Sequence, residues 1–483
     1  METEVSLELW PFLVGAINLF AATFAAGHAL LTKRDVRAAI AWLGVIILLP
    51  VFGWAIYLVL GINRIARRAQ ELRAGVHTTG DLELPDNAPP TLAIADGAGG
   101  EWMMRMTRIG RKIADTPYTL GNDIRLLRDG DEAYPAMLEA IGNAKNTIAL
   151  STYIFNNDTA GKRFLAALKQ AHERGVKVRV LIDGVGAWYS FPSMIRRLRQ
   201  ADIPHARFLH SFLPWQMPYL NLRNHQKILV IDGQKGFTGS MNIAEGNLIA
   251  EGPRHPIHDY HFAVDGPVVS HLMAAFAHEW RFSTGEILTS ERWMPQLQSR
   301  GQIAARGLPA GPDMSRNTIR WTILAALTEA REQVRIVTPY FLPDAELITA
   351  LSLAAMRGVS VDIVLPGKNN LAYMTWATRA LLDELIQAGC RIWKSTGPFD
   401  HAKLMTVDRS WSLVGSANWD PRSLRLNFEF NLECYSVNLA AELNQAIDTK
   451  IATATAETAK SLKNRALSTK LRDNIARLMS PYL

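Results

Sequence analysis

The segment NHQKILVIDG at residues 224–233 combines a histidine, a lysine and a branched apolar run that ends in Asp-Gly. The pattern of His, any residue, Lys, four residues and Asp occurs again in HAKLMTVD at residues 401–408. Side chains two residues apart on a strand share a face, so we expect His225 beside Lys227 and His401 beside Lys403. Each copy therefore supplies one imidazole and one cation.

Both copies lead into Gly-Ser-x-Asn, at residues 239–242 and 415–418, and both occupy the same place in a repeated strand, helix, strand order. The elements expected in the two repeats are 146–155, 161–174 and 176–183, then 333–341, 345–357 and 358–366. This rhythm is typical of α/β folds with mostly parallel strands. The duplication predicts two similar α/β lobes with mixed sheets, whose half-sites converge through pseudo-twofold pairing of equivalent strands.

A chain of 483 residues is too long for one ordinary domain. We expect a membrane hairpin at 1–68, a linker at 69–121, a first lobe at 122–300 and a second lobe with C-terminal helices at 301–483. No charged residue occurs from about 10 to 31 or from 38 to 62, so each run predicts a membrane span. Acidic residues first and a second apolar run afterwards argue against a signal peptide.

Two groups of basic residues give opposite predictions for the orientation of this hairpin in the membrane. Basic residues after the second run favour a cytoplasmic main domain, whereas those between the runs favour the opposite side. These residues are Arg64, Arg67, Arg68 and Arg73 in the first group and Lys33, Arg34 and Arg37 in the second. A re-entrant or interfacial first helix stays open.

Two further segments each have two open interpretations. Residues 102–113 mix apolar and basic side chains, so they form either a helix on an anionic bilayer or a helix packed on the main domain. Residues 208–220 are unusually aromatic and either enter lipid or fill the cleft between the lobes. The stretch 441–481 predicts helices without assigned chemistry.

The composition bounds the partners. The net charge of +7 favours an anionic partner, and the apolar runs favour a phospholipid membrane over nucleic acid. Cys390 and Cys434 have no zinc-site spacing and are expected as buried core thiols. The oligomeric state is not determined by the sequence.

The duplicated residues suit attack on a phosphodiester. Its negative charge repels nucleophiles, so Lys227 and Lys403 would neutralise the non-bridging oxygens, and the amides of the two motif asparagines would donate to them. A neutral imidazole can attack phosphorus, and a protonated one can donate to the leaving alkoxide. The asparagines are Asn242 and Asn418, and the scheme needs neither a metal nor a cofactor.

Each imidazole also needs a partner on its other ring nitrogen. Asp259 follows the first copy and Glu429 the second, and we expect each to accept a hydrogen bond from the imidazole of its own lobe. By contrast, Asp232 and Asp408 come at strand ends and suit turns on physical grounds.

The paired motifs resemble the phospholipase D superfamily. The continuation GSANWDPRSLRLNFE at 415–429 and the apolar run AWLGVIILLPVFG at 41–53 resemble bacterial cardiolipin synthases in particular. The resemblance implies transfer of a phosphatidyl group between two phosphatidylglycerol molecules with release of glycerol. It implies His225 as nucleophile and His401 as acid and later base. It also implies a bacterial inner membrane as the location, with the catalytic domain on the cytoplasmic side.

The resemblance also places both motif aspartates, Asp232 and Asp408, in the catalytic set with the lysines. One departure stands out: the family usually has Trp-Arg-Asp where this chain has Ile257, His258 and Asp259. The carboxylate is kept but its neighbours are not, which leaves the headgroup or acceptor choice open.

Three alternatives remain. A phospholipase D would pass the same intermediate to water and release phosphatidic acid. A superfamily nuclease would explain the positive charge but not the apolar runs. A non-enzymatic, membrane-anchored binding module would have no need for both intact His/Lys pairs.

Overall fold

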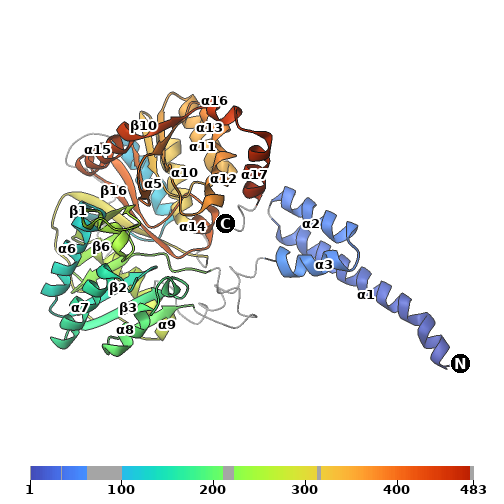
Figure 1. Cartoon of the computed structure of the whole chain (residues 1–483), viewed down its shortest axis with the longest axis horizontal. Helices are drawn as coiled ribbons and strands as arrows, with labels where there is room; N and C mark the ends of the chain where they lie inside the picture. Colours follow the sequence, from blue (N-terminus) through green and yellow to red (C-terminus); the bar gives the residue numbers. More distant parts are fainter. Residues whose placement is uncertain (1, 34, 63–99, 210–221, 313–316, 479–483) are drawn as a thin grey trace. The chain divides into compact units, whose positions relative to one another are not determined.

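The computed structural model describes residues 2–33, 35–62, 100–209, 222–312 and 317–478. They belong to two compact units, Met1–Arg68 and Ala69–Leu483 (Figure 1). The linker expected before residue 100, the arginines that follow the second apolar run, and nearly all of the aromatic segment 208–220 lie outside the described residues.

The N-terminal unit is helical. Its elements are α1 (Glu2–Thr32), α2 (Val36–Leu48), α3 (Phe52–Ile56) and a π-helix, η1 (Tyr57–Gly61). Within the described chain, one segment is long and apolar enough to cross a membrane, Phe12–Thr32 in α1. At 1.5 Å per residue this segment spans about 31 Å, which matches a hydrocarbon core of about 30 Å. The first expected span is therefore present as a helix.

The second expected span, 38–62, is wrong as a single crossing helix. The chain breaks after α2 at Pro50, which lacks a backbone N–H, and at Val51, whose φ is 72°. With 13 residues, α2 is about 20 Å long and too short to cross. It packs against α3 at Gly53, where a Cβ would meet the Val45 carbonyl oxygen at 2.2 Å.

Side chains from α1 and its end fix this short helical hairpin at both ends. The backbone N–H of Val51 and the indole N–H of Trp54 donate to Asn18 Oδ1 at 3.0 and 2.9 Å. At the other end, the Lys33 ammonium donates to the carbonyl of Gly61. The α2–α3 hairpin therefore folds back beside α1, with its entry and exit at the same level.

The larger unit, Ala69–Leu483, is built on one sheet of fifteen strands among the described residues. The first lobe contributes β1 (Thr119–Arg128), β2 (Thr147–Thr152), β3 (Lys177–Asp183), β4 (His205–Phe208), β5 (Ile228–Ile231), β6 (Lys235–Gly239) and β8 (Tyr260–Asp265). The second contributes β9 (Ile303–Ala310), β10 (Gln333–Val337), β11 (Ser360–Pro366), β12 (Arg391–Ser395), β14 (Leu404–Val407), β15 (Trp411–Gly415), β16 (Glu429–Tyr435) and β17 (Thr455–Glu457). A separate pair is formed by β7 (Ile257–His258) and β13 (Phe399–Asp400).

The strand order displays the duplication directly. From the centre outward, one half reads β1-β8-β6-β5-β2-β3-β4 and the other reads β9-β16-β15-β14-β10-β11-β12. In the first half β2 and β3 pair in parallel, as β10 and β11 do in the second. The strand after each His/Lys motif, β5 or β14, pairs antiparallel with β2 or β10. The equivalent strands β1 and β9 pair antiparallel, with Thr119 opposite Ala305. The expected pseudo-twofold pairing is confirmed.

Helices cover both faces of the sheet (Figure 1). Around the first lobe lie α6 (Asp129–Asn143), α7 (Thr159–Glu173), α8 (Met194–Gln200), α9 (Val269–Thr284) and the short helices η3 (Gly186–Trp188), η5 (Glu245–Asn247) and η6 (Ile249–Glu251). Around the second lie α10 (Thr318–Glu329), α11 (Ala345–Met356), α12 (Ala372–Arg379), α13 (Leu382–Gln387), α14 (Pro421–Arg425), α15 (Val437–Thr453), α16 (Ala459–Lys463) and α17 (Leu467–Leu478). Both cysteines are free and buried, as expected.

The segment 102–113 is a packed helix, α5 (Gly100–Ile113), and not an interfacial one. Trp102, Met103 and Met106 are buried in the core of the second lobe. The Trp102 indole N–H donates to the Glu329 carbonyl at 2.9 Å, and Arg105 pairs with the Glu329 carboxylate at 2.7 Å. The larger unit therefore includes residues assigned to the linker on sequence grounds.

Candidate active site

The two histidines stand where the lobes exchange backbone hydrogen bonds. His225 donates its backbone N–H to the carbonyl of Phe428 at 2.8 Å, and His401 donates to the carbonyl of His258 at 2.7 Å. Phe428 directly precedes Glu429, and His258 directly precedes Asp259. Each histidine segment is therefore aligned with the carboxylate-bearing segment of the opposite lobe.

This pairing overturns the expected own-lobe partners. His225 Nδ1 lies 3.0 Å from Glu429 Oε2, and His401 Nδ1 lies 2.7 Å from Asp259 Oδ2. The hydrogen bonds cross between lobes because β13, just before His401, pairs with β7, just before Asp259. A single bridge between Asn224 and Phe428 does the same on the other side of the pseudo-twofold axis.

The environment of His225 fixes its tautomer. Its Nδ1 also lies 3.2 Å from the Ser416 carbonyl oxygen, so both neighbours of this nitrogen are acceptors. Nδ1 therefore carries the proton, and Nε2 keeps its lone pair. This is the arrangement that a nucleophilic imidazole needs.

The Gly-Ser-x-Asn motifs hold the two carboxylates in place, a role that the sequence analysis missed. Ser240 donates its hydroxyl to Asp259, and Ser416 donates to Glu429. The preceding glycines allow the close approach: a Cβ on Gly239 would lie 2.8 Å from the Tyr260 carbonyl, and one on Gly415 would lie 2.4 Å from that of Phe430.

The motif His and Lys residues lie just before their strands, β5 and β14, and not on them. The Lys227 ammonium donates to the carbonyl of His225 at 2.6 Å, and that of Lys403 donates to the carbonyl of His401 at 2.7 Å. Lys403 Nζ also lies 3.0 Å from His401 Nε2. Each lysine thus lies beside its histidine, as expected, because its ammonium group binds the backbone carbonyl of that histidine.

Burial dominates the electrostatics of the imidazoles. It lowers the pKa of His225 to about 4, with Glu429 opposing and both motif lysines adding to the shift. Burial and the charge of Lys403 also lower the pKa of His401, against the opposing effect of Asp259. Both imidazoles are therefore neutral near pH 7. The crossed hydrogen bonds bring these groups of both lobes into one centre.

The lysines are perturbed in the same direction. Burial lowers the pKa of Lys227 to about 7 and that of Lys403 to about 8, although nearby carboxylates favour the charged forms. Burial alone would raise the pKa of Asp259, but His401 and Lys403 outweigh it and lower that pKa to about 2. Glu429 is likewise ionised, since the same balance with His225 lowers its pKa.

The two motif asparagines flank this centre through different contacts. Asn242 Oδ1 accepts the backbone N–H of Ile154 at 3.1 Å, which orients its amide. Asn418 is buried, and its Nδ2 donates to the hydroxyl of Ser423 at 3.1 Å. Contact of either amide with a phosphate remains a prediction.

Asp232 and Asp408 are not brought to the centre. Asp232 accepts backbone N–H groups of Lys145, Asn146 and Thr147 at 2.6–2.9 Å, and Asp408 makes the equivalent contacts with residues 331–333. Each sits at the far end of its strand, seven residues from the histidine, or roughly 20 Å. Their geometry is that of turn residues that fasten the preceding loop, in agreement with the physical expectation and not with the catalytic set.

Two tyrosines belong to the centre although sequence reasoning did not select them. The Tyr153 ring lies 5.1 Å from the His225 ring, and the Tyr340 ring lies 6.5 Å from that of His401. Lys227 Nζ lies 5.6 Å from the Tyr153 ring centre. Their occurrence after the equivalent strands β2 and β10 was the signal that could have identified them.

The departure from the family pattern lies beside the second imidazole. His258 Nδ1 is 2.9 Å from Asp129 Oδ2, and this hydrogen bond raises the pKa of His258. Asp129 also accepts the backbone N–H of Asp259 at 2.8 Å. Within the described ranges, no cluster of three or more His, Cys, Asp or Glu is arranged to hold a metal ion.

Two pseudo-symmetric lobes that each contribute His-x-Lys and Gly-Ser-x-Asn to one buried centre define a phospholipase D-like enzyme. Family models support and narrow this class. The model "Cardiolipin synthase, PLD-like domain" matches residues 137–280 and 323–451, and "Phospholipase_D-nuclease N-terminal" matches residues 20–61. The chain belongs to the cardiolipin synthase family and is a membrane-associated phosphatidyltransferase that acts on phospholipid.

Relatives cover most of the chain. A cardiolipin synthase of Geobacillus sp. (strain WCH70) is 31% identical over 94% of this chain and 90% of its own length. One of Staphylococcus aureus (strain N315) is 30% identical over 93% and 92%. Among solved structures, the phosphatidylserine synthase of Haemophilus influenzae superimposes with a TM-score of 0.62 at 15% identity, covering 78% of this chain and 100% of its own, which shows a shared fold.

Proposed function

We propose that the enzyme makes cardiolipin from two phosphatidylglycerol molecules and releases glycerol. The observation that carries this proposal is the pair of crossed hydrogen bonds, His225 to Glu429 and His401 to Asp259, within one buried centre that holds two lysines. A transfer between two alcohols needs one nucleophile and one group that gives a proton and later takes one. The names of the relatives suggest the substrate pair.

In the first step, the lone pair on Nε2 of His225 attacks phosphorus and forms a P–N bond. The P–O bond to the glycerol headgroup breaks, and protonated His401 donates to the departing oxygen. Because burial lowers the pKa of free His401, its proton must be stabilised by the phosphate charge when the lipid binds. Lys227 and Lys403 supply positive charge to the non-bridging oxygens.

In the second step, neutral His401 takes the proton from a glycerol hydroxyl of a second phosphatidylglycerol. The resulting oxygen attacks phosphorus, the P–N bond breaks, and His225 returns to its starting form. Glu429 and Asp259 keep the protons on Nδ1 throughout, so Nε2 of each ring does the chemistry.

We also infer that the catalytic unit lies on the cytoplasmic side. If α1 crosses and the α2–α3 hairpin is re-entrant, Lys33 and Gly61, which share a hydrogen bond, are expected at one face of the membrane. A single crossing then predicts both basic groups of the sequence on the same side of the membrane, as the positive-inside bias favours. Asn18 would satisfy the irregular backbone of the hairpin tip within the membrane.

The decisive experiment supplies the full-length protein in proteoliposomes with phosphatidylglycerol labelled in both the glycerol headgroup and the phosphate. The proposal expects labelled cardiolipin and free glycerol in equal amounts. Phosphatidic acid without cardiolipin would instead assign a phospholipase D. Loss of product in both His225→Asn and His401→Asn, with folding retained, would separate catalysis from binding alone.

A further inference from the structure

The last described helix, α17, is held firmly on the second lobe by one face. Asp473 is fully buried and pairs with Arg465 at 2.5 Å and Arg472 at 2.8 Å. The Arg472 guanidinium lies 4.4 Å from the centre of the Trp376 ring on α12. Ala476 packs into a cluster with Met374 and other residues of α12 and its surroundings.

The opposite face of α17 is a stripe of large aliphatic side chains in solvent. Its members, with their exposed fractions, are Leu467 73%, Leu471 56%, Ile475 63% and Leu478 75%. Spacings of four, four and three residues place them on one side of a helix. Because Asp473 and Ala476 occupy the other side, this α17 stripe is a continuous apolar surface and not a set of scattered residues.

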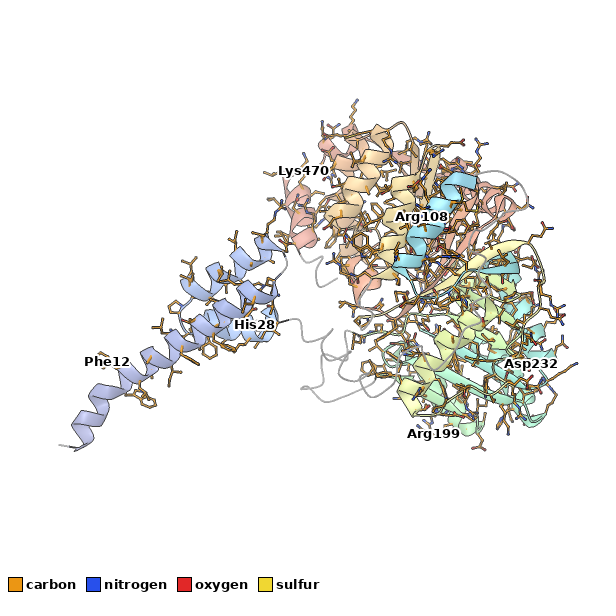
Figure 2. All side chains as sticks on the ribbon, turned by 180° about the vertical axis from the view of Figure 1, so that it is seen from behind. Phe12, His28, Arg108, Arg199, Asp232 and Lys470 are labelled. Carbon is orange, nitrogen blue, oxygen red and sulfur yellow. The ribbon has the colours of Figure 1, made fainter. Side chains whose placement is uncertain are left out.

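The charges around the α17 stripe indicate what covers it. Lys470 and Arg477 flank it on the same helix, and Lys460 and Lys463 are exposed on the neighbouring α16. Figure 2 shows Lys470 at the opposite side of the catalytic unit from Asp232. An apolar stripe bordered by cations is suited to an anionic bilayer, where aliphatic side chains enter the acyl region and cations meet phosphates.

The same surface is connected to the active centre. The cluster under α17 includes Tyr340, whose ring contacts that of His401. In the first lobe, Tyr153 contacts His225 and also Tyr189, at 6.1 Å between ring centres. Tyr189 directly follows η3. We call residues 186–191, which are η3 and the turn after it, the loop 186–191; in it Tyr189 is 61% and Phe191 98% exposed. In each lobe, therefore, a single tyrosine contacts both the imidazole and the residues next to an exposed apolar surface.

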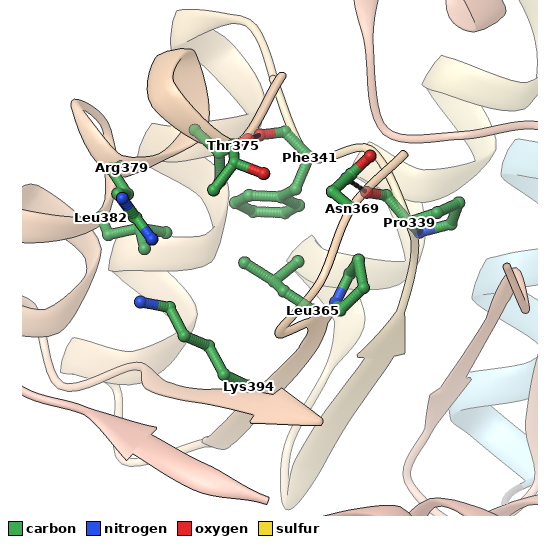
Figure 3. A pocket seen from close by; sticks show the side chains of 10 residues that line it. Pro339, Phe341, Leu365, Asn369, Thr375, Arg379, Leu382 and Lys394 are labelled. Atoms are coloured by element: carbon green, nitrogen blue, oxygen red, sulfur yellow. Dashed lines mark hydrogen bonds between the residues drawn. The ribbon is translucent and has the colours of Figure 1, made fainter. Parts of the chain in front are cut away.

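A nearby hollow cannot serve as an internal lipid site. It lies between β11, β12 and α12, with Phe341 and Leu365 on its walls and Arg379 and Lys394 at its rim (Figure 3). Its volume is about 20 Å³, room for roughly one water molecule and far less than an acyl chain requires. The acyl chains of a substrate therefore do not fit in this hollow and must bind elsewhere.

We propose that α17 and the loop 186–191 rest together on the anionic bilayer, with the α17 stripe among the acyl chains. This contact holds the edge of the catalytic unit that contains Tyr153 and Tyr340 against the lipid surface. The substrate headgroup then reaches the two imidazoles while its acyl chains stay in the bilayer. The docking itself does not depend on the proposed function, although its effect on rate does.

Docking is tested directly in the full-length protein in vesicles of phosphatidylglycerol and phosphatidylethanolamine. Leu471→Cys and Ile475→Cys are labelled with a polarity-sensitive fluorophore, with Glu173→Cys at an exposed position of α7 as the control. Nitroxide groups on the acyl chains should quench the first two labels at least about threefold more than the control. Equal quenching, or cross-linking of Leu471→Cys between two copies, would overturn the proposal in favour of another occupant.

The effect of docking on the reaction rate is tested with matched surface variants. Leu471→Asp with Ile475→Asp should raise the vesicle concentration for half-maximal rate about tenfold or more, while activity on short-chain phosphatidylglycerol dispersed in detergent stays within about twofold. Leu353→Asp with Met356→Asp, on exposed positions of α11, should leave both unchanged. An unchanged vesicle dependence in the α17 variant refutes the docking role. If the wild-type protein made no cardiolipin, the quenching result would still stand by itself.

Discussion

Substitution of Glu429 by Gln tests the crossed arrangement of the centre most directly. Oε2 of Glu429 accepts from both His225 and Ser416, while Oε1 accepts from Asn427 at 3.1 Å. A glutamine side chain has one oxygen, so its NH₂ group must face a donor on one side or the other. The variant therefore loses at least one charge-assisted hydrogen bond in a fully buried place.

Loss of such a bond costs about 1.5–3 kcal/mol. If this falls on the transition state, and each 1.36 kcal/mol is tenfold in rate, kcat should fall about 10- to 150-fold. The phosphate contacts proposed for the lysines are untouched, so KM should change little. Steady-state kinetics on vesicles measures both quantities.

The crossing gives a sharper signature in the formation of the covalent adduct. With a p-nitrophenyl phosphatidyl donor, the leaving group needs little acid catalysis, so the burst of nitrophenol reports His225 alone. Glu429→Gln should slow that burst, because Glu429 orients His225. Asp259→Asn should leave the burst near wild type and slow the subsequent transfer, because Asp259 orients His401.

The reverse pattern, with a slow burst only in Asp259→Asn, would refute the crossed assignment. Asp232→Asn makes the same chemical change in a carboxylate outside the centre and should give a normal burst per folded molecule. Peptide mass spectrometry of the trapped adduct should find the phosphatidyl group on His225, and its presence on His401 would exchange the proposed roles.

The remaining predictions concern pH, stability and orientation. A lysine is cationic below its pKa, so as pH rises through about 7 to 8 the ammonium groups of Lys227 and Lys403 are lost in the free enzyme, and kcat/KM should fall over that range. Asp232→Ala removes the acceptor for three backbone N–H groups and should lower the free energy of unfolding by about 1–3 kcal/mol, measured by chemical denaturation, with activity per folded molecule nearly unchanged. If α1 crosses the membrane once, residue 8 and residue 173 lie on opposite sides. A membrane-impermeant maleimide should then label Glu8→Cys in intact cells and Glu173→Cys only after permeabilisation. Equal labelling of the two variants would require an even number of crossings and would contradict the single crossing.

Much of this protein follows from its sequence. The repeated His-x-Lys and Gly-Ser-x-Asn motifs determined that two half-sites exist, because each motif is local and its spacing is preserved in both copies. The alternation of strands and helices predicted the two lobes and their elements to within a few residues, since apolar periodicity reflects local burial. Physical reasoning about turns also identified the role of Asp232 and Asp408, against the family pattern.

Tertiary structure decided which groups act together. In the sequence, Asp259 follows His225 and Glu429 follows His401, yet pairing of β7 with β13 and of Asn224 with Phe428 exchanges the partners. Such contacts join segments far apart in the chain and leave no periodic signal in either one.

The membrane unit and α17 depended on tertiary contacts for the same reason. The apolar run 38–62 is long enough to cross as one helix, but the turn at Pro50, supported by Asn18 of another helix, divides it. Likewise, the pattern of α17 predicts a helix, whereas only its packing on α12 determines which face is left exposed. The apolar side chains of each segment determine that one of its faces can be buried. The tertiary contacts determine which neighbouring element covers that face.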